Sequence, residues 1–125
     1  MSPTPSIAKP VFKPDITFQV VPEALEERCT IVHCLLSEET LVRVWPTTFL
    51  VQHDGVRKAL LQAYNITEYP YWTWAHPGHC FTLVFEGLDK DCPLFDLLED
   101  IPEPGGFHVR DIRRNRQDVY TVEIG

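Results

Sequence analysis

Apolar and polar side chains alternate in steps of two along most of this 125-residue chain, the spacing of β-strands with one face turned toward a core. β-Branched and aromatic residues dominate the alternating runs, and clusters of proline, glycine and aspartate separate them. Segment 29–36 is mostly apolar on both faces, which is typical of a strand in the middle of a sheet. No run in the sequence shows the period of a long helix, so the pattern predicts an all-β fold.

The expected strands are short, and turns separate them. They cover 16–21, 29–36, 41–52, 56–64, 81–85, 107–112 and 119–124. Pro46 should bend or interrupt its strand because proline cannot donate to a neighbouring strand, and Asp54-Gly55 is a strong hairpin signal. Segment 93–100 fits a strand or a helical turn. About seven to nine short strands predict an immunoglobulin-like antiparallel β-sandwich.

The composition indicates one globular domain. The chain is 44% hydrophobic and 23% charged, which suits a core of its own. Residues 1–13 are expected to form a flexible leader and 14–125 a single sandwich domain. The leader lacks the apolar block of a signal peptide, and no run approaches the ~20 apolar residues of a membrane-spanning helix. We therefore expect a cytoplasmic protein with no membrane partner, whose four cysteines are reduced.

The net charge of −7 argues against general nucleic-acid binding, because phosphates would be repelled. Basic side chains concentrate at Arg110, Arg113, Arg114 and Arg116. We favour a charged strand edge, which discourages edge-to-edge aggregation, over a site for an anion or an acidic partner. An acidic stretch, 89–103, precedes these arginines and could face them across strands.

Several strand motifs resemble those of a known domain family. They are TFLV at 48–51 with the Asp-Gly turn after it, LLQAYNI at 60–66, FTLVFEGL at 81–88, FDLLE at 95–99 and a Gly-Gly-Phe before the next strand. Over roughly residues 41–112 the chain resembles a β-sandwich domain family of unknown function that is common in Bacteroidota proteins. Such domains are often appended to thioredoxin-like or peptidase domains. The resemblance implies an immunoglobulin-like sandwich and carries no catalytic residue.

The strongest functional hint is an aromatic run that contains Tyr69, Tyr71, Trp72 and Trp74. Tryptophan and tyrosine are favoured at binding hot spots, and their rings can stack on a partner's side chains or on sugars. Strand alternation would put Trp72 and Trp74 on one face and Tyr69 and Tyr71 on the other, with one pair in the core. We expect a protein partner or self-association through the surface pair, with a homodimer or carbohydrate binding as alternatives.

A second candidate combines His76, His79 and Cys80 with Cys92, twelve residues on. Imidazole and thiolate are the ligands that zinc prefers, so the alternative function is a small metal-binding protein or hydrolase. The spacing lacks the two-residue knuckle of zinc folds. A turn that carries histidines before a core strand is the interpretation we favour, and no cofactor is expected.

Catalytic chemistry has little support elsewhere. Asp96, Glu99 and Asp100 could do acid–base work, but carboxylates before a proline turn commonly accept hydrogen bonds from backbone amides. The sequence contains no Gly-x-Ser-x-Gly elbow and no phosphate-binding loop. These patterns together predict a non-enzymatic β-sandwich module that binds a partner.

Overall fold

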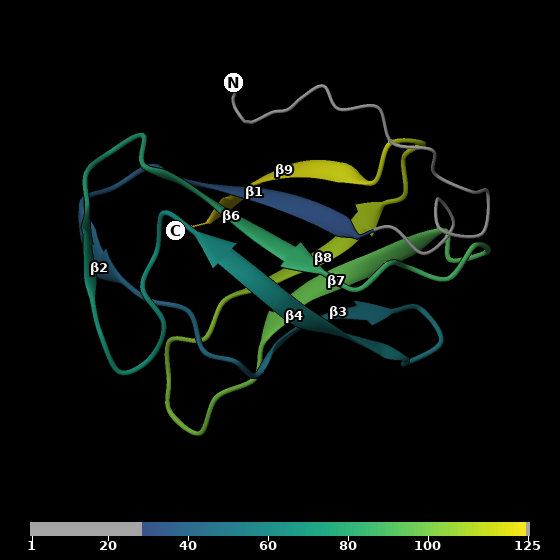
Figure 1. Ribbon diagram of the computed structural model, residues 1–125, viewed down its shortest axis with the longest axis horizontal. Helices are drawn as coiled ribbons and strands as arrows, with labels where there is room; N and C mark the ends of the chain where they lie inside the picture. Colours follow the sequence, from purple (N-terminus) through teal and green to yellow (C-terminus); the bar gives the residue numbers. More distant parts are fainter. Residues whose placement is uncertain (1–28, 125) are drawn as a thin grey trace, which may run out of the picture.

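The computed structural model describes residues 29–124, and this part of the chain is built from nine β-strands (Figure 1). They are β1 (Thr30–Leu36), β2 (Thr40–Val42), β3 (Thr48–Gln52), β4 (Arg57–Tyr64), β5 (Thr73–Ala75), β6 (Cys80–Phe85), β7 (Leu94–Glu99), β8 (His108–Arg113) and β9 (Val119–Ile124). Seven form one sheet in the order β8-β7-β3-β4-β6-β1-β9, and β2 and β5 form a separate two-stranded sheet. The all-β prediction is confirmed.

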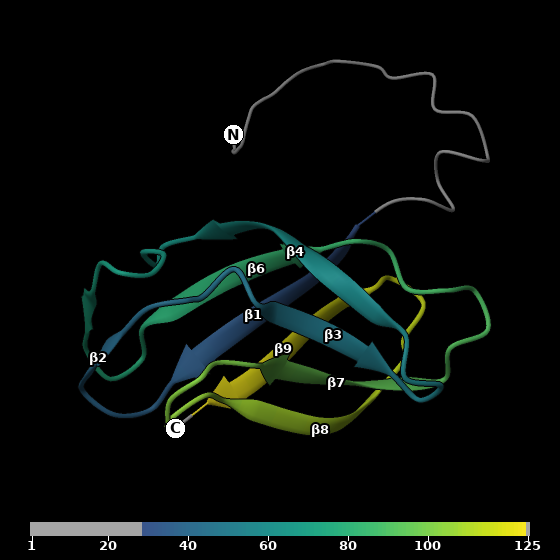
Figure 2. The same cartoon turned by 90° about the horizontal axis from the view of Figure 1, so that it is seen from below.

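The seven-stranded sheet bends at β4. This strand pairs with β3 through Ala59 and with β6 from Leu60 onward, and the register shifts between Leu60 and Gln62. A register irregularity of this kind increases local twist and bends a sheet. As a result β1, β4 and β6 lie across from β7 and β8 (Figure 2). The ring of Phe95 in β7 lies 4.9 Å from that of Tyr120 in β9, centroid to centroid. The bent sheet therefore encloses the core in a sandwich- or barrel-like arrangement.

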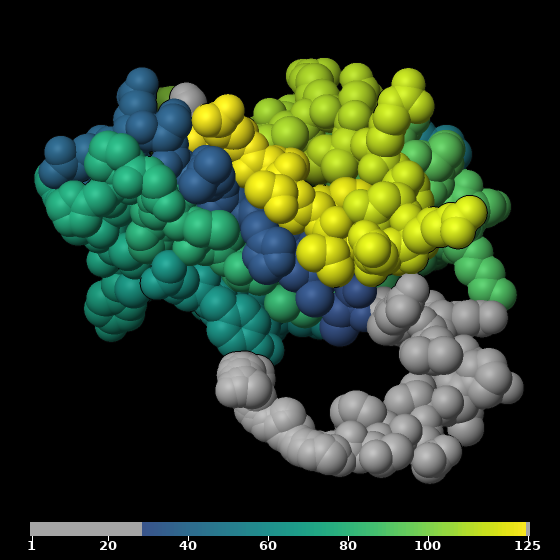
Figure 3. Space-filling view, turned by 90° about the horizontal axis from the view of Figure 1, so that it is seen from above, coloured from purple at the N-terminus to yellow at the C-terminus, as the bar shows by residue number. Residues whose placement is uncertain are grey.

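One strand pair departs from the expected antiparallel arrangement. β1 and β9 run parallel, with Ile31 opposite Val119 and Leu36 opposite Ile124. Figure 3 shows the yellow surface of β9 lying along the blue surface of β1. β8 and β9 are the two edges of the large sheet. The last residues of β1 and β9, Leu36 and Ile124, therefore lie side by side at one end of the molecule.

The core follows from strand alternation. In β1, β6 and β7 every second side chain is buried. The largest fully buried side chains are Phe81, Phe85, Phe95, Leu50, Leu83 and Leu97. Burying side chains of this size stabilises the fold by roughly 1.5–3 kcal/mol each relative to exposure.

Most expected strands are found, and the ambiguous one is resolved. The strand expected over 41–52 is divided into β2 and β3, with Pro46 between them, and 93–100 contains a strand rather than a helical turn. In the described residues, no helix is long and apolar enough to cross a membrane. The leader over 1–13 and the strand expected over 16–21 lie outside the described residues.

The four cysteines are free thiols, and their positions differ from one another. Cys34 and Cys92 are buried and behave as small apolar side chains, whereas Cys29 and Cys80 are exposed. Burial, together with the nearby Cys80, raises the pKa of the Cys34 thiol to about 12, so this thiol is unreactive at neutral pH.

The basic segment divides between the edge strand and an internal ion pair. Arg110 and Arg113 are exposed on β8, at the edge of the sheet, as the favoured interpretation expects. Arg114 instead donates from Nε and Nη2 to the two carboxylate oxygens of Asp118, at 2.6 and 3.1 Å. Asp118 is buried and also accepts a hydrogen bond from the Tyr120 hydroxyl at 2.9 Å. This network fixes the turn between β8 and β9.

Candidate functional site

The aromatic run lies on the connection between β4 and β5, and all four of its predicted binding residues are exposed. Tyr71 is 71% exposed, Trp72 52% and Trp74 54%, and Tyr69 is similarly open. The expectation that strand alternation would bury one pair is wrong. Only Thr73–Ala75 forms a strand here, so the backbone before it does not alternate. All four rings are available to a partner.

This connection is held in place by hydrogen bonds. The Thr67 amide donates to the Thr73 hydroxyl at 2.9 Å, and the Thr67 hydroxyl donates to the Tyr71 carbonyl at 3.0 Å. Val44 bonds through its backbone to both Thr67 and Tyr69. The exposed rings are therefore carried by a fixed backbone, and less ordering entropy is lost when a partner binds.

A single arginine contacts two rings of the aromatic run and the ring of Trp45. The guanidinium carbon of Arg43 lies 3.9 Å from the ring centroid of Trp72, 4.7 Å from that of Tyr69 and 5.6 Å from that of Trp45. The rings of Trp45 and Tyr69 are themselves stacked at 3.8 Å. We call these four residues the Arg43 stack. Cation–π contacts of this kind contribute about 0.5–2 kcal/mol each, more where the cation is desolvated.

The guanidinium of Arg43 also has polar partners. It donates to the Pro70 carbonyl at 3.0 Å and forms an ion pair with Glu103 at 3.5 Å. Its side chain is mostly buried. Arg43 thus fastens the aromatic connection, through Pro70, to the loop between β7 and β8, through Glu103.

The small sheet extends the exposed apolar surface. Leu41 of β2 lies directly opposite Trp74 of β5 in the register, and both are about half exposed. Opposite positions in an antiparallel pair have neighbouring side chains. Together with the rings of the aromatic run they form one exposed surface, which we call the aromatic face: Leu41, Tyr69, Tyr71, Trp72 and Trp74. Exposed apolar surface of this extent is typical of interaction sites.

A groove of about 310 Å³ runs beside the aromatic face. Its walls include Leu36, Leu41, Ile124, Phe107 and Trp72. The loop between β7 and β8 closes one side of the groove, and there the backbone of Gly106 packs closely against the backbone of Glu99. A Cβ at Gly106 would lie 2.5 Å from the backbone oxygen of Glu99, so only glycine fits at that position.

Glu99 lines this groove and is only 6% exposed. It is the last residue of β7 and lies on the same inward face as Phe95 and Leu97. Burial raises the pKa of its carboxyl above the usual range, although the backbone amides of Trp45 and Phe107 and the charge of Arg43 oppose the shift. The Trp45 amide donates to Oε2 at 3.3 Å. A carboxylate at this position carries a real desolvation cost.

The other two members of the predicted carboxylate group, Asp96 and Asp100, have different partners from Glu99. Asp96 accepts hydrogen bonds from the Asp111 amide and from His108, each at 2.9 Å. Asp100 pairs with Arg57 at 3.1 Å. The expectation that these carboxylates accept backbone amide bonds is confirmed for Asp96 and Glu99.

The four residues of the alternative metal site do not come together. Cys80 begins β6, near the end of β1, whereas Cys92 lies beyond the other end of β6, where Arg114 donates to its carbonyl at 3.1 Å. His79 bonds to the Asn65 carbonyl at 2.9 Å, and His76 lies edge-on to Trp74. Among residues 29–124 no group of three or more histidine, cysteine, aspartate or glutamate side chains could hold a metal ion.

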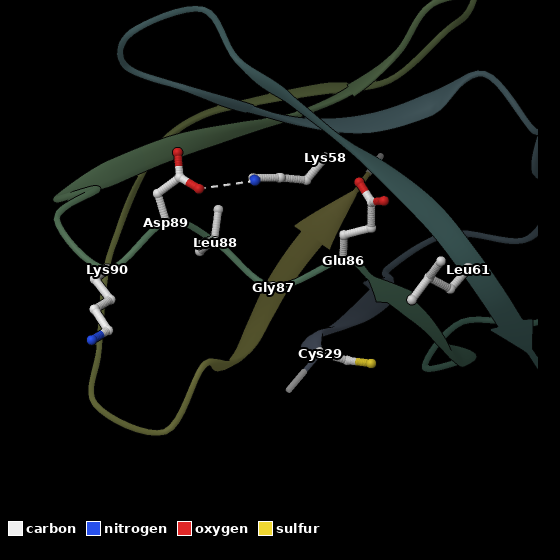
Figure 4. Close-up of a pocket in the computed structure, with 8 residues that line it drawn as sticks. All are labelled: Cys29, Lys58, Leu61, Glu86, Gly87, Leu88, Asp89 and Lys90. Atoms are coloured by element: carbon white, nitrogen blue, oxygen red, sulfur yellow. Dashed lines mark hydrogen bonds and ion pairs between the residues drawn. The ribbon is translucent and has the colours of Figure 1, made fainter. Parts of the chain in front are cut away.

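A larger hollow, of about 620 Å³, lies at the opposite end of β1 (Figure 4). It is lined by Cys29, Lys58, Leu61, Glu86 and residues 87–90. Lys58 pairs with Asp89 at 2.9 Å, and the Glu86 carboxylate accepts a hydrogen bond from the Ala59 amide at 2.9 Å. This polar surface offers a ligand less apolar contact than the groove beside Trp72, despite its greater volume.

Comparison with protein-family models, with curated proteins and with solved structures finds no match to this chain. Sequence reasoning identified the aromatic run and expected Glu99, with Asp96 and Asp100, to accept hydrogen bonds from backbone amides, but it assigned no role to Arg43 and did not predict the burial of Glu99. Alternation within 95–99 places Glu99 on the same side as Phe95 and Leu97, and this signal could have identified it as an inward carboxylate.

Proposed function

We propose that this domain is a non-enzymatic binding module that recognises a protein partner through the aromatic face. The supporting observation is that Tyr71, Trp72 and Trp74 are all more than half exposed while the backbone beneath them is fixed by hydrogen bonds. Exposing large rings to water is unfavourable unless a partner covers them. Fixed tryptophan and tyrosine side chains are the residues most often found at binding hot spots.

The partner we favour is a protein, and a second copy of the chain is one form of it. Exposed polar residues stand next to members of the aromatic face in the chain, Thr40 beside Leu41 and Glu68 beside Tyr69, and such mixing is typical of a non-obligate interface. An immunoglobulin-like arrangement and a cytoplasmic location belong to the same proposal. The bent sheet supports the first, and the four free thiols support the second, because reducing compartments keep cysteines unpaired.

Replacing Trp74 with alanine should weaken partner binding by at least about tenfold, since truncating a hot-spot ring typically costs about 2 kcal/mol or more. The matched control is Leu61→Ala, which removes an apolar side chain that is 51% exposed on another part of the molecule. Partner binding is measured as the amount of partner protein retained by the immobilised parent or variant domain. Self-association is measured by sedimentation velocity over a range of concentrations.

Both variants should keep the circular dichroism spectrum of the parent, because each replaces an exposed side chain. Equal retention and equal self-association in the Trp74 variant and the parent would refute the proposal. Loss of the folded spectrum in the Trp74 variant would mean that the ring is a structural element. Binding to a glycan array that is lost in the Trp74 variant would assign the surface to carbohydrate instead.

A further inference from the structure

The groove beside Trp72 contains a buried acidic side chain, Glu99, that forms no direct ion pair with Arg43, the basic residue of the groove lining. Glu99 is 6% exposed and accepts the Trp45 amide at 3.3 Å. Arg43 directs its own guanidinium to Glu103 and to the Pro70 carbonyl. Within residues 29–124, no lysine, arginine or histidine nitrogen lies within 4.0 Å of the Glu99 carboxylate. Buried carboxylates are normally paired, so this one needs an explanation.

The groove walls have the chemistry that complements the stem of a long basic side chain. Leu36, Leu41, Ile124 and Phe107 supply apolar surface, and Trp72 supplies a ring. Long basic side chains place their methylene groups against such surface while the charged end finds polar partners. Glu103, about half exposed, adds a second carboxylate to the groove lining. The groove therefore combines an aliphatic and aromatic wall with two acids and one arginine, Arg43, which is paired with Glu103.

We propose that this groove binds a basic side chain, lysine or arginine, presented by an extended segment of the partner protein. The cation would meet Glu99, and its aliphatic stem would lie against the apolar walls. The inference rests on the proposed function, because Trp72 belongs to both the groove and the aromatic face. The groove would add a preference for partners that present lysine or arginine, which the aromatic face does not provide by itself. The net charge of −7 also favours encounter with a basic partner.

The volume of the groove is consistent with one side chain and its neighbours. About 310 Å³ lies at the lower end of the range for small-ligand sites. A short extended peptide with a central basic residue is therefore a suitable probe. We choose a panel of acetylated, amidated pentapeptides, Gly-Leu-Xaa-Leu-Gly, in which Xaa is lysine, arginine, norleucine or glutamate. Norleucine keeps the aliphatic stem and lacks the charge.

Binding is followed by the NMR shifts of the Trp45 and Trp72 indole groups during titration. The lysine and arginine peptides should bind at least about tenfold more tightly than the norleucine peptide, and the glutamate peptide should be weakest. Glu99→Gln should reduce the affinity for the lysine peptide to the affinity for the norleucine peptide. The matched control Glu38→Gln, an exposed acid after β1, should leave the preference unchanged.

A second measurement does not depend on a variant that folds. The Glu99 carboxyl carbon, titrated in the parent protein, should show a lower pKa in the presence of the lysine peptide and no change with the norleucine peptide. Equal affinities for the lysine and norleucine peptides, no binding by any of them, or an unchanged Glu99 titration would overturn the inference. If one of these results is obtained while partner retention still depends on Trp74, the proposed role of the groove is wrong, and the proposed role of the aromatic face is retained.

Discussion

Replacing Arg114 with alanine is expected to lower the free energy of unfolding by about 3–5 kcal/mol, the range for removing one partner of a buried ion pair. Both side chains of the Arg114–Asp118 pair are mostly buried. The variant would leave the Asp118 carboxylate with the Tyr120 hydroxyl as its remaining side-chain partner. It would also remove the bonds from Arg114 to the carbonyls of Asp89 and Cys92. Because these reach the segment before β7, the loss should affect the whole fold.

The measurement is urea unfolding followed by tryptophan fluorescence. Arg113→Ala is the control, because Arg113 is exposed on the edge strand and should change the unfolding free energy by less than about 0.5 kcal/mol. The guanidinium of Arg114 is mostly buried and bonded to Asp118 and to two carbonyls, whereas Arg113 is exposed. A change below about 1 kcal/mol for the Arg114 variant would show that the network is not a major source of stability.

Arg43→Ala has the second large expected effect, and it acts on binding as well as stability. The variant removes the cation from the three rings, the bond to the Pro70 carbonyl and the ion pair with Glu103. We expect a loss of stability of about 2 kcal/mol, the size of one charge-assisted bond with some cation–π energy. Partner binding should fall by at least about tenfold, because Trp72 and Tyr69 lose their support.

A closely matched control exists on the same protein. Arg57 also lies over an aromatic ring, that of Phe49 at 5.0 Å, and also pairs with an acid, Asp100. Its pair is exposed, so Arg57→Ala should cost less than about 1 kcal/mol and leave partner binding unchanged. Arg43→Lys should restore only part of the effect, because an ammonium does not stack on rings as a planar guanidinium does. Equal effects of the Arg43 and Arg57 variants would contradict the role of the Arg43 stack.

The sequence predicted the strands because their signal is local. Alternation and turn residues placed β1, β3, β4, β6, β8 and β9 close to where they lie. Segment 93–100 was ambiguous because the spacing of its apolar residues suits a helical turn as well as a strand. Pairing with β3 and β8, which the local sequence does not encode, resolves it as β7.

The site is less predictable because its contacts join distant parts of the chain. The aromatic run was visible, but the exposure of all four rings depends on a connection pinned to Val44. Arg43 bonds to Pro70 twenty-seven positions away, and Trp45 bonds to Glu99 across fifty-four. The groove exists only because the ends of β1 and β9 meet beside the loop after β7. Strand patterns in the sequence carry no information on such contacts between distant segments.

The central claim, that the aromatic face is the protein-binding surface, is tested most directly by photocrosslinking inside living cells. Benzoylphenylalanine is placed at Tyr71, which is 71% exposed on the aromatic face, or at Tyr64, which is 51% exposed on β4. The account predicts a discrete crosslinked adduct from position 71 that disappears when Trp74 is replaced with alanine, and none from position 64. An adduct at twice the mass of 14.4 kDa would identify a second copy as the partner. Adducts from position 64 alone, or from position 71 without dependence on Trp74, would contradict the account.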